Sequence, residues 1–340
     1  MWKAILKKSL KISAGFIASI FVADWLGLKY FVTAGIVNIL GLGKTQRETY
    51  KSASHRGLAF AGGVAIAYLC FELLGINLWG FSAYICLFVP FCLYFRWREA
   101  VVIDTVLISH FLSEGSMSLP VLWNEIQLFL VGTFFAILVN LSLHPNEKKF
   151  SKRADEVDEE IKKLMLVLSD RIRMQDKSKV DFEENIFADL DEKLYEARKC
   201  ALTNYDNSIF RKDSKESEIE IDYIEMRQKQ RMLLEEINYL IKTIHFTPVQ
   251  ANEVADFLCH VQEEHQRYNP VVTLLEEVDQ LFENMKTEEL PQTREEFEAR
   301  AGLFYILKHI RYLLRLKRAF AEKYADHMDP VKAEAALDNH

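Results

Sequence analysis

The hydrophobic positions follow two different patterns, with long apolar runs in the first part of the chain and helix-periodic stripes after it. Six apolar runs occupy residues 10–28, 30–43, 58–75, 78–95, 100–113 and 120–143. An α-helix needs ~20 apolar residues to cross the ~30 Å hydrocarbon layer of a bilayer. Four of the runs meet or approach that length, and the second and fifth are shorter. The pattern predicts an all-α membrane domain of six transmembrane helices in residues 1–145.

The pattern after residue 145 is that of a water-exposed helical bundle. Charged residues alternate with apolar ones at three- and four-residue spacing, as in the stripe Val157, Ile161, Leu164, Leu168 and Ile172. Nothing in this part alternates with the two-residue period of a strand. We expect five to six helices in residues 146–328 and a disordered tail in residues 329–340.

Capping signals mark where several of these helices should begin. Thr247-Pro248 and Asn269-Pro270 each place a proline where a first helical turn tolerates it. Thr293 followed by Glu296 has the spacing of a capping box. We expect the last long helix to begin at Thr293 and to end near Ala325.

Composition divides the chain at the same boundary. All glycines except Gly302 and all five tryptophans precede residue 133. Residues 1–144 carry 11 Lys+Arg and 7 Asp+Glu, whereas residues 145–340 carry 31 and 42. The two parts are therefore suited to different environments, and the whole-chain charge of −7 is an average over both.

The basic residues of the membrane part lie in alternate connections. They precede the first run and follow the second, fourth and sixth runs, where they include Lys44, Arg56, Arg96 and Arg98. Because cytoplasmic loops are enriched in Lys and Arg, both termini should be cytoplasmic. The first run should be an uncleaved helix, because Phe21 and Ala23 fit a signal-peptide cleavage site poorly and more spans follow. Trp25, Trp79 and Trp123 would then lie at the outer interface.

The two short runs point to a transport site. When six helices are divided as a 3+3 inverted repeat, the short runs are the middle members, and such paired short spans often line the pathway of transporters. The candidate pathway residues are Asn38, Asp104, Thr105, Ser109 and His110. Ionisable groups inside a span are costly and are functional candidates by default.

The role of Asp104 has two interpretations. It is either a coupling acid for a proton or a cation, or a structural partner of Arg56 that fixes the bundle. His110 is six residues away and does not share its helical face. We expect Glu125 to lie near the outer helix ends, where solvation is an adequate account of it. Lys44, Arg56, Arg96 and Arg98 would ring the cytoplasmic mouth and concentrate anions there.

The sequence contains near matches to nucleotide-binding, metal-binding and nucleic-acid-binding motifs, but none has the required residues or spacing. NILGLGKT (38–45) lacks the first glycine of a nucleotide-binding loop and ends an apolar run. In CHVQEEH (259–265) the two histidines are five residues apart, so they point away from each other on a helix. The basic face of the last helix, which includes Arg311, has acidic residues nearby that can pair with it. We expect no enzymatic activity, cofactor, metal or nucleic-acid partner.

Two stretches resemble a known family. LKISAGFIASIFVADWLGLKYFVTAGIVNIL and the later EIDYIEMRQKQRMLLEEI (220–237) are similar to the bacterial aromatic acid exporter family, within the fusaric-acid-resistance-like superfamily. The second stretch resembles the signature helix of its C-terminal domain. The resemblance implies an inner-membrane efflux protein with a cytoplasmic helical domain, which acts as a homodimer in membrane lipid.

Three functions remain open from the sequence. The first is a secondary, proton-coupled exporter of aromatic or other small organic anions. The second is a passive anion channel related to plant malate channels, whose flux follows voltage. The third is a membrane-anchored scaffold whose bundle binds a partner.

Overall fold

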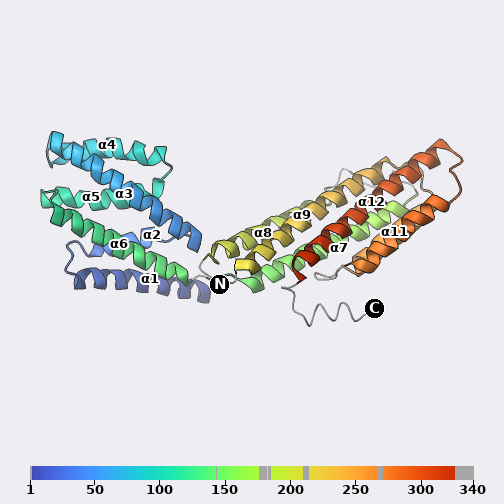
Figure 1. Cartoon of the computed structure of the whole chain (residues 1–340), viewed down its shortest axis with the longest axis horizontal. Coiled ribbons are helices and arrows are strands. Elements are labelled where there is room, and N and C mark those ends of the chain that lie inside the picture. The colour runs from blue at the N-terminus through green and yellow to red at the C-terminus, as the bar shows by residue number, and fades with distance from the viewer. Residues whose placement is uncertain are drawn as a thin grey trace. The chain divides into compact units, whose positions relative to one another are not determined.

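The computed structural model describes residues 2–142, 144–175, 182, 185–209, 214–265 and 271–325. These residues form twelve helices and their connections, without a strand, which confirms the all-α prediction (Figure 1). The chain divides into two compact units. Unit 1 comprises Met1–Pro145 and Tyr205–Lys212, and unit 2 comprises Asn146–Asn204 and Asp213–His340. The expected disordered tail, 329–340, lies outside the described residues.

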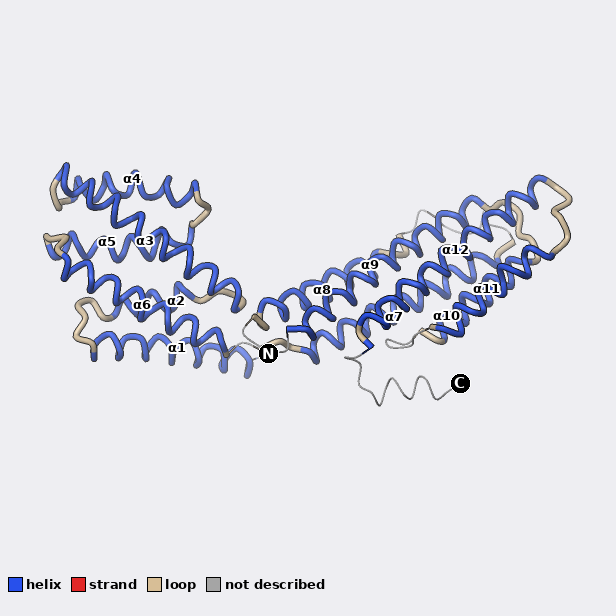
Figure 2. The backbone as a smooth tube through the Cα atoms, in the orientation of Figure 1, coloured by secondary structure: helices blue, strands red, loops and turns tan. Residues whose placement is uncertain are grey.

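Unit 1 contains six helices joined by short connections (Figure 2). They are α1 (Trp2–Trp25), α2 (Val32–Gly41), α3 (Gln46–Leu74), α4 (Leu78–Tyr94), α5 (Arg98–Glu114) and α6 (Leu119–Leu141). Helix α2 packs against α1 and α6, while α5 packs against α4 and α3. Tyr84, Phe88, Leu107 and Phe111 are among the fully buried residues of its core.

Helix α3 begins twelve residues earlier than the apolar run that predicted it. The Thr45 side chain accepts a hydrogen bond from the backbone N–H of Glu48 (3.2 Å), and the Glu48 carboxylate accepts one from Lys44 N–H (2.6 Å). This reciprocal capping starts the helix at Gln46, so the polar residues that follow are helical. The expectation that Arg56 lies in the connection between two helices was therefore wrong.

The helices of unit 1 differ in length. Helices α3 (29 residues) and α6 (23 residues) are long and apolar enough to cross a membrane, whereas α2 and α4 are shorter apolar helices. Helix α4 has 17 residues, as α5 does, although its apolar run was expected to be of full length. The side chain of Asn77 caps its start, and Arg96, with φ +61°, lies in the turn after its end.

Unit 2 contains the other six described helices. They are α7 (Glu147–Arg173), α8 (Ala188–Asp206), α9 (Ser214–Thr243), α10 (Gln250–Glu263), α11 (Val272–Thr287) and α12 (Arg294–Lys323). Helix α7 packs against α9 and α10, and α12 packs against α9, α10 and α11. All five residues of the predicted α7 stripe are buried in the core of this unit.

The predicted helix starts of unit 2 had different outcomes. The Thr293 side chain accepts from Glu296 N–H (3.1 Å), which confirms the predicted cap of α12. The expectation that a helix begins at Thr247-Pro248 was wrong. The Thr247 hydroxyl donates to the Met174 carbonyl (3.0 Å), and α10 begins at Gln250. Asn269-Pro270 lies outside the described residues.

Two surface motifs of unit 2 make contacts with acidic side chains nearby. Arg311, on the basic face of α12, is 2.9 Å from the carboxylate of Asp279 on α11. His260 lies 2.8 Å from the carboxylate of Glu277, while His265 is buried. The two histidines of CHVQEEH thus occupy separate environments.

Candidate functional site

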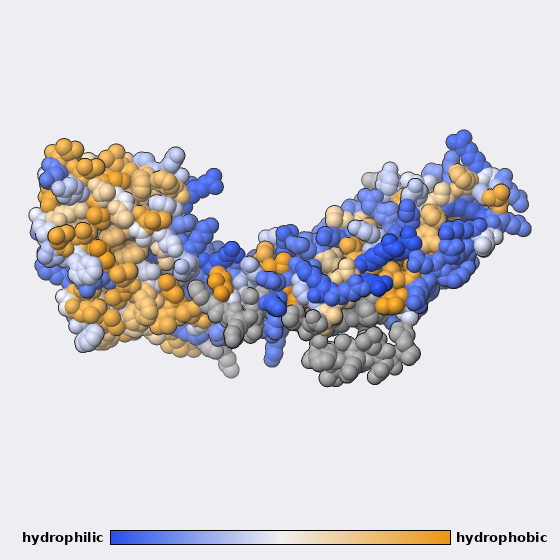
Figure 3. Space-filling model, in the orientation of Figure 1, coloured by the Kyte–Doolittle hydropathy of each residue, from blue (hydrophilic) through white to orange (hydrophobic). Residues whose placement is uncertain are grey.

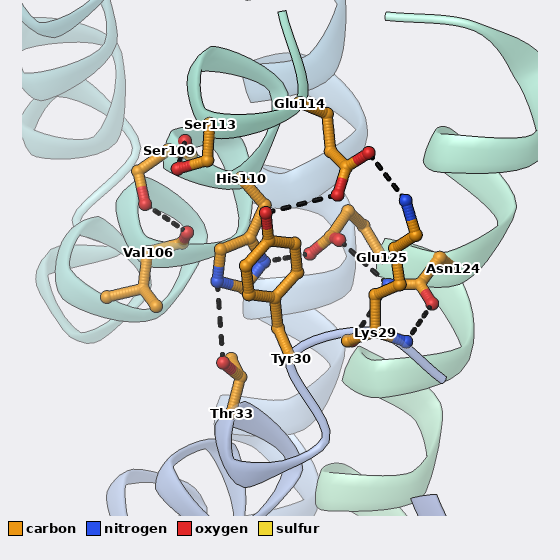
Figure 4. A network of polar contacts seen from close by, with 10 residues as sticks. All are labelled: Lys29, Tyr30, Thr33, Val106, Ser109, His110, Ser113, Glu114, Asn124 and Glu125. Carbon is orange, nitrogen blue, oxygen red and sulfur yellow. Dashed lines mark hydrogen bonds and ion pairs between the residues drawn. The ribbon is translucent and has the colours of Figure 1, made fainter. Parts of the chain in front are cut away.

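Buried polar side chains gather at two places inside unit 1. One, the histidine cluster, lies where the α1–α2 connection meets the end of α5 and the start of α6 (Figure 4). It consists of Lys29, Tyr30, Thr33, His110, Glu114, Asn124 and Glu125. The other, the Arg56–Asp104 pair, lies between α3, α5 and the C-terminal end of α2.

The centre of the histidine cluster is a buried contact between two helices. His110 Nδ1 on α5 is 2.7 Å from Glu125 Oε2 on α6, and the Glu125 side chain is fully buried. His110 Nε2 is 3.4 Å from the hydroxyl of Thr33 on α2 (Figure 4). The imidazole therefore joins three helices, which corrects the expectation that solvation accounts for Glu125.

An aromatic ring covers this histidine. The ring of Tyr30 stacks on the imidazole of His110, with 4.1 Å between centroids and 9° between planes. Tyr30 adopts φ +58°, a left-handed conformation that costs a non-glycine residue energy and persists only when its surroundings enforce it. The Tyr30 hydroxyl donates to Glu114 (3.1 Å), and Glu114 pairs with the exposed Lys29 (2.7 Å). Lys29 N–H donates to the side-chain oxygen of Asn124 (2.8 Å), whose amide nitrogen donates to Glu125 (3.0 Å), so hydrogen bonds lead from the surface to Glu125 (Figure 4).

The sequence held a partial signal for this cluster. His110 lies five residues before Gly115, and Glu125 lies seven residues after Ser118. The short connection 115–118 makes α5 and α6 an antiparallel hairpin, so positions at similar distances from it lie side by side. Tyr30 and Thr33 belong to no such pattern, and sequence reasoning missed them.

Arg56 and Asp104 are both fully buried in unit 1. Arg56 Nε donates to the Ser52 carbonyl (3.2 Å), and Nη2 donates to the Gly41 carbonyl (3.2 Å). Nη1 of Arg56 and both carboxylate oxygens of Asp104 have no hydrogen-bond partner among the described residues. The negative charge of Asp104 attracts Arg56 electrostatically. The two side chains nevertheless form no hydrogen bond with each other.

The position of Arg56 depends on the end of α2. Helix α2 ends at Gly41, so its last carbonyls lack helical partners and carry the negative end of the helix dipole. A Cβ at Gly41 would lie 2.9 Å from Arg56 Nη1 and 3.0 Å from the Ala136 Cβ. A side chain at Gly41 would therefore displace the guanidinium from the Gly41 carbonyl.

The other predicted pathway residues are Asn38, Thr105 and Ser109. Asn38 is fully buried, neither of its amide atoms has a partner in the described chain, and it packs beside Gly15 of α1. Thr105 and Ser109 are half-buried, and the Ser109 hydroxyl donates to the Val106 carbonyl of its own helix (2.7 Å). The side chains of Asp104 and His110 belong to different clusters.

The remaining mouth candidates are separate from Arg56. Lys44 lies before α3, and Arg96 and Arg98 lie before and at the start of α5; all three are exposed. Of the four residues expected at the mouth, only Arg56 is inside the unit.

Comparisons with known proteins agree over most of the chain. Residues 4–143 match the family model described as "Aromatic acid exporter family member 1", and residues 147–318 match "Putative aromatic acid exporter C-terminal domain". The chain is 26% identical over 313 residues to "Uncharacterized protein YqjA" of Bacillus subtilis (strain 168), covering 92% of this chain and 95% of that protein.

A solved structure also shares similarity with this chain. The "Crystal structure of putative membrane protein from Clostridium difficile 630" has 21% sequence identity and a TM-score of 0.42, and the match covers 52% of this chain and 98% of that one. The two family matches together include nearly every residue of both units. The chain therefore belongs to the aromatic acid exporter family.

Proposed function

We propose that this protein is a membrane exporter of small organic acids, including aromatic ones. In this proposal residues 1–145 cross the membrane six times with both termini in the cytoplasm, and the bundle of residues 146–328 is cytoplasmic. Family membership supports a membrane transporter. The substrate class and the mechanism are inferred from the site.

The surface of unit 1 supports the six-span arrangement. Apolar residues cover much of its visible face, whereas polar residues dominate that of unit 2 (Figure 3). Large apolar side chains such as Phe21 and Leu73 are 69% and 82% exposed, which is unusual in a soluble monomer. Trp25, Trp79 and Trp123 are exposed at helix ends, as in the aromatic belt of a membrane protein.

Helix packing supports a 3+3 inverted repeat. Helix α2 packs against α1 and α6, as α5 packs against α4 and α3; α1 contacts α6, as α4 contacts α3. Exchanging α1 with α4, α2 with α5 and α3 with α6 reproduces each of these contacts. Inverted repeats commonly place the substrate site where their middle helices end or break inside the membrane.

The observation that carries the proposal is the buried, incompletely bonded Arg56 at the end of α2. A guanidinium presents a planar fork of donors that matches a carboxylate, and Nη1 of Arg56 has no hydrogen-bond partner in the described part of the chain. Glu99 and Asp104 supply the negative charge that acts on Arg56. We infer that Arg56 holds the carboxylate of the substrate and that Asp104 carries the coupling proton.

A flux assay tests this role of Arg56. Efflux of labelled benzoate is measured from proteoliposomes containing wild-type protein, Arg56→Gln or Lys51→Gln. Loss of a charge-assisted hydrogen bond is worth ~1.5–3 kcal/mol, so Arg56→Gln should slow efflux by about 10- to 100-fold. Lys51 is exposed on the same helix, and its variant should export as wild type does.

The same vesicles distinguish the alternatives. Flux that follows an imposed voltage and ignores pH would identify a passive anion channel. Equal, background-level flux in wild type and Arg56→Gln would contradict transport of this substrate class and favour the scaffold interpretation. Equal insertion of all variants into the vesicles is the control for folding.

A further inference from the structure

The interior of unit 2 holds a second set of buried polar side chains that transport in unit 1 does not use. This bundle cluster comes from four of the helical segments packed together there. Its members are Asp158 on α7, Tyr223, Arg227 and Gln230 on α9, His265 after α10, and Lys317 on α12. The three α9 residues lie within the signature stretch 220–237.

The guanidinium of Arg227 is neutralised inside this cluster. It lies 2.9 Å from the carboxylate of Asp158, which also accepts a hydrogen bond from the Tyr223 hydroxyl (2.6 Å). Arg227 Nη1 donates to the side-chain oxygen of Gln230 (2.6 Å), whose amide nitrogen donates to the Leu313 carbonyl (3.1 Å). These contacts fix Arg227 and Asp158 as a charge-neutral pair.

Lys317 and His265 are also buried, but neither has a hydrogen-bonded carboxylate partner of the kind that Asp158 provides for Arg227 among the described residues. The side chains are 2% and 3% exposed, and Lys317 Nζ and His265 Nε2 have no hydrogen-bond partner among the described residues. An unpaired ammonium group in a protein interior is costly, and such a group either loses its proton or binds an anion. The two free donors therefore require an explanation.

The electrostatics of the cluster favour one additional negative charge. Burial and the charge of Arg227 lower the pKa of Lys317 to about 7, and Asp158 and Glu264 oppose this shift. Burial and the charges of Arg227, Lys317 and Lys162 lower the pKa of His265 well below its ordinary value. His265 is therefore neutral at physiological pH, and protonated Lys317 adds one charge beyond the neutral Arg227–Asp158 pair.

We propose that Lys317 and His265 form a binding site for a small monocarboxylate anion in the interior of the cytoplasmic bundle. The Lys317 ammonium forms the ion pair, and the Nε2–H tautomer of neutral His265 donates a hydrogen bond to the same carboxylate. The single excess charge suits a monoanion better than a dianion. The choice of a carboxylate rests on the proposed function, since the bundle would then bind the acid that the membrane unit exports.

The site predicts a coupling between anion binding and protonation. An anion beside Lys317 stabilises the ammonium form, so binding at pH 7.5 takes up a proton. Above the pKa of Lys317 the affinity should fall by about tenfold per pH unit. Below it the affinity should depend little on pH until the carboxylate itself becomes protonated.

Calorimetry on the full-length protein in detergent tests the site with benzoate as the probe. Arg56→Gln serves as the background, because it removes the proposed site in unit 1. Titration in two buffers of different ionisation enthalpy measures proton uptake. We expect saturable binding with uptake of a fraction of a proton at pH 7.5, weakened at least tenfold by Lys317→Met and severalfold by His265→Gln.

The exposed Lys308 lies on the same helix as Lys317, so Lys308→Met is the matched control and should bind as the background does. Hydrogen exchange of α9 and α12 verifies that each variant is folded. Unchanged affinity and proton uptake in Lys317→Met would overturn the proposal, as would absence of saturable binding up to about 10 mM benzoate, a binding energy under ~3 kcal/mol. Neither result depends on whether Arg56 supports transport, which the efflux assay measures separately.

Discussion

Arg56 of α3 donates a 3.2 Å hydrogen bond from Nη2 to the carbonyl of Gly41, the last residue of α2. A buried positive charge is thus stabilised by the end of a short helix and by the carboxylates of Glu99 and Asp104. This geometry leaves Nη1 unbonded within the described residues. The histidine cluster of unit 1 and the bundle cluster of unit 2 likewise hold buried polar groups whose loss has measurable consequences.

Substituting Gly41 should impair transport through Arg56. In Gly41→Ala the new methyl group would meet Arg56 Nη1 at 2.9 Å and Ala136 at 3.0 Å. We expect efflux to fall about tenfold and stability to fall by ~1–3 kcal/mol, as for overpacked interiors. Gly57→Ala is the matched control, because its methyl group would meet only Phe129, at 3.8 Å. Equal benzoate efflux in both variants would contradict this role of Gly41.

The contact between His110 and Glu125 should stabilise unit 1. Glu125→Gln and His110→Gln each leave a buried polar partner incompletely bonded, at a cost of ~1–3 kcal/mol. Because the two groups touch, the double variant should cost less than the sum of the single ones. Thermal unfolding in detergent measures this cycle. Glu114→Gln, whose partner Lys29 is exposed, should cost under ~1 kcal/mol, and additive costs for Glu125 and His110 would refute the coupling.

The bundle should be sensitive to loss of the carboxylate of Asp158. Asp158→Asn leaves Arg227 buried without its counter-charge, and breaking a buried pair costs ~3–5 kcal/mol. Glu298→Gln removes the exposed partner of Arg294 and should cost at most ~0.5 kcal/mol. Hydrogen-exchange protection of α9, measured in the full-length protein, gives the loss of stability in each of the two variants. Similar protection in the two variants would show that the buried pair does not stabilise the bundle.

Lys317 should make the bundle more stable as pH rises. Its pKa is about 7 in the folded protein and near 10.5 when unfolded, so the unfolded chain binds more protons between these values. Stability therefore increases from pH 7 to pH 10. Hydrogen-exchange protection of α12, corrected for the intrinsic rate at each pH, should show this increase in wild type and lose it in Lys317→Met. The same pH dependence in both proteins would assign it to other groups.

Some site residues could be predicted from the sequence because their chemistry is unusual for their position. Asp104 and His110 were identified as ionisable groups within an apolar run. Lys317 carries a comparable signal, since it continues the core spacing of Ile310, Leu313 and Leu314 on α12. Charge at a position that the helical period assigns to the core is visible in the sequence alone.

Other features depend on tertiary contacts that a local pattern does not encode. Arg56 was placed outside the helix because the apolar run begins at residue 58, yet the Thr45 cap starts α3 earlier. Glu125 was assigned to a solvated helix end, but the α1–α2 connection places Tyr30 over its partner His110. In both cases a neighbouring segment determines whether a polar residue is buried.

The pH dependence of benzoate efflux in Asp104→Asn is the decisive test of proton-coupled export through unit 1. Efflux from proteoliposomes is measured at two external pH values, for wild type and Asp104→Asn at equal protein content. Proton coupling through Asp104 predicts that wild-type efflux changes with pH and that the variant, which cannot exchange the proton, loses this dependence. Export by Asp104→Asn with the rate and pH dependence of wild type would contradict a proton-coupled pathway through the Arg56–Asp104 pair.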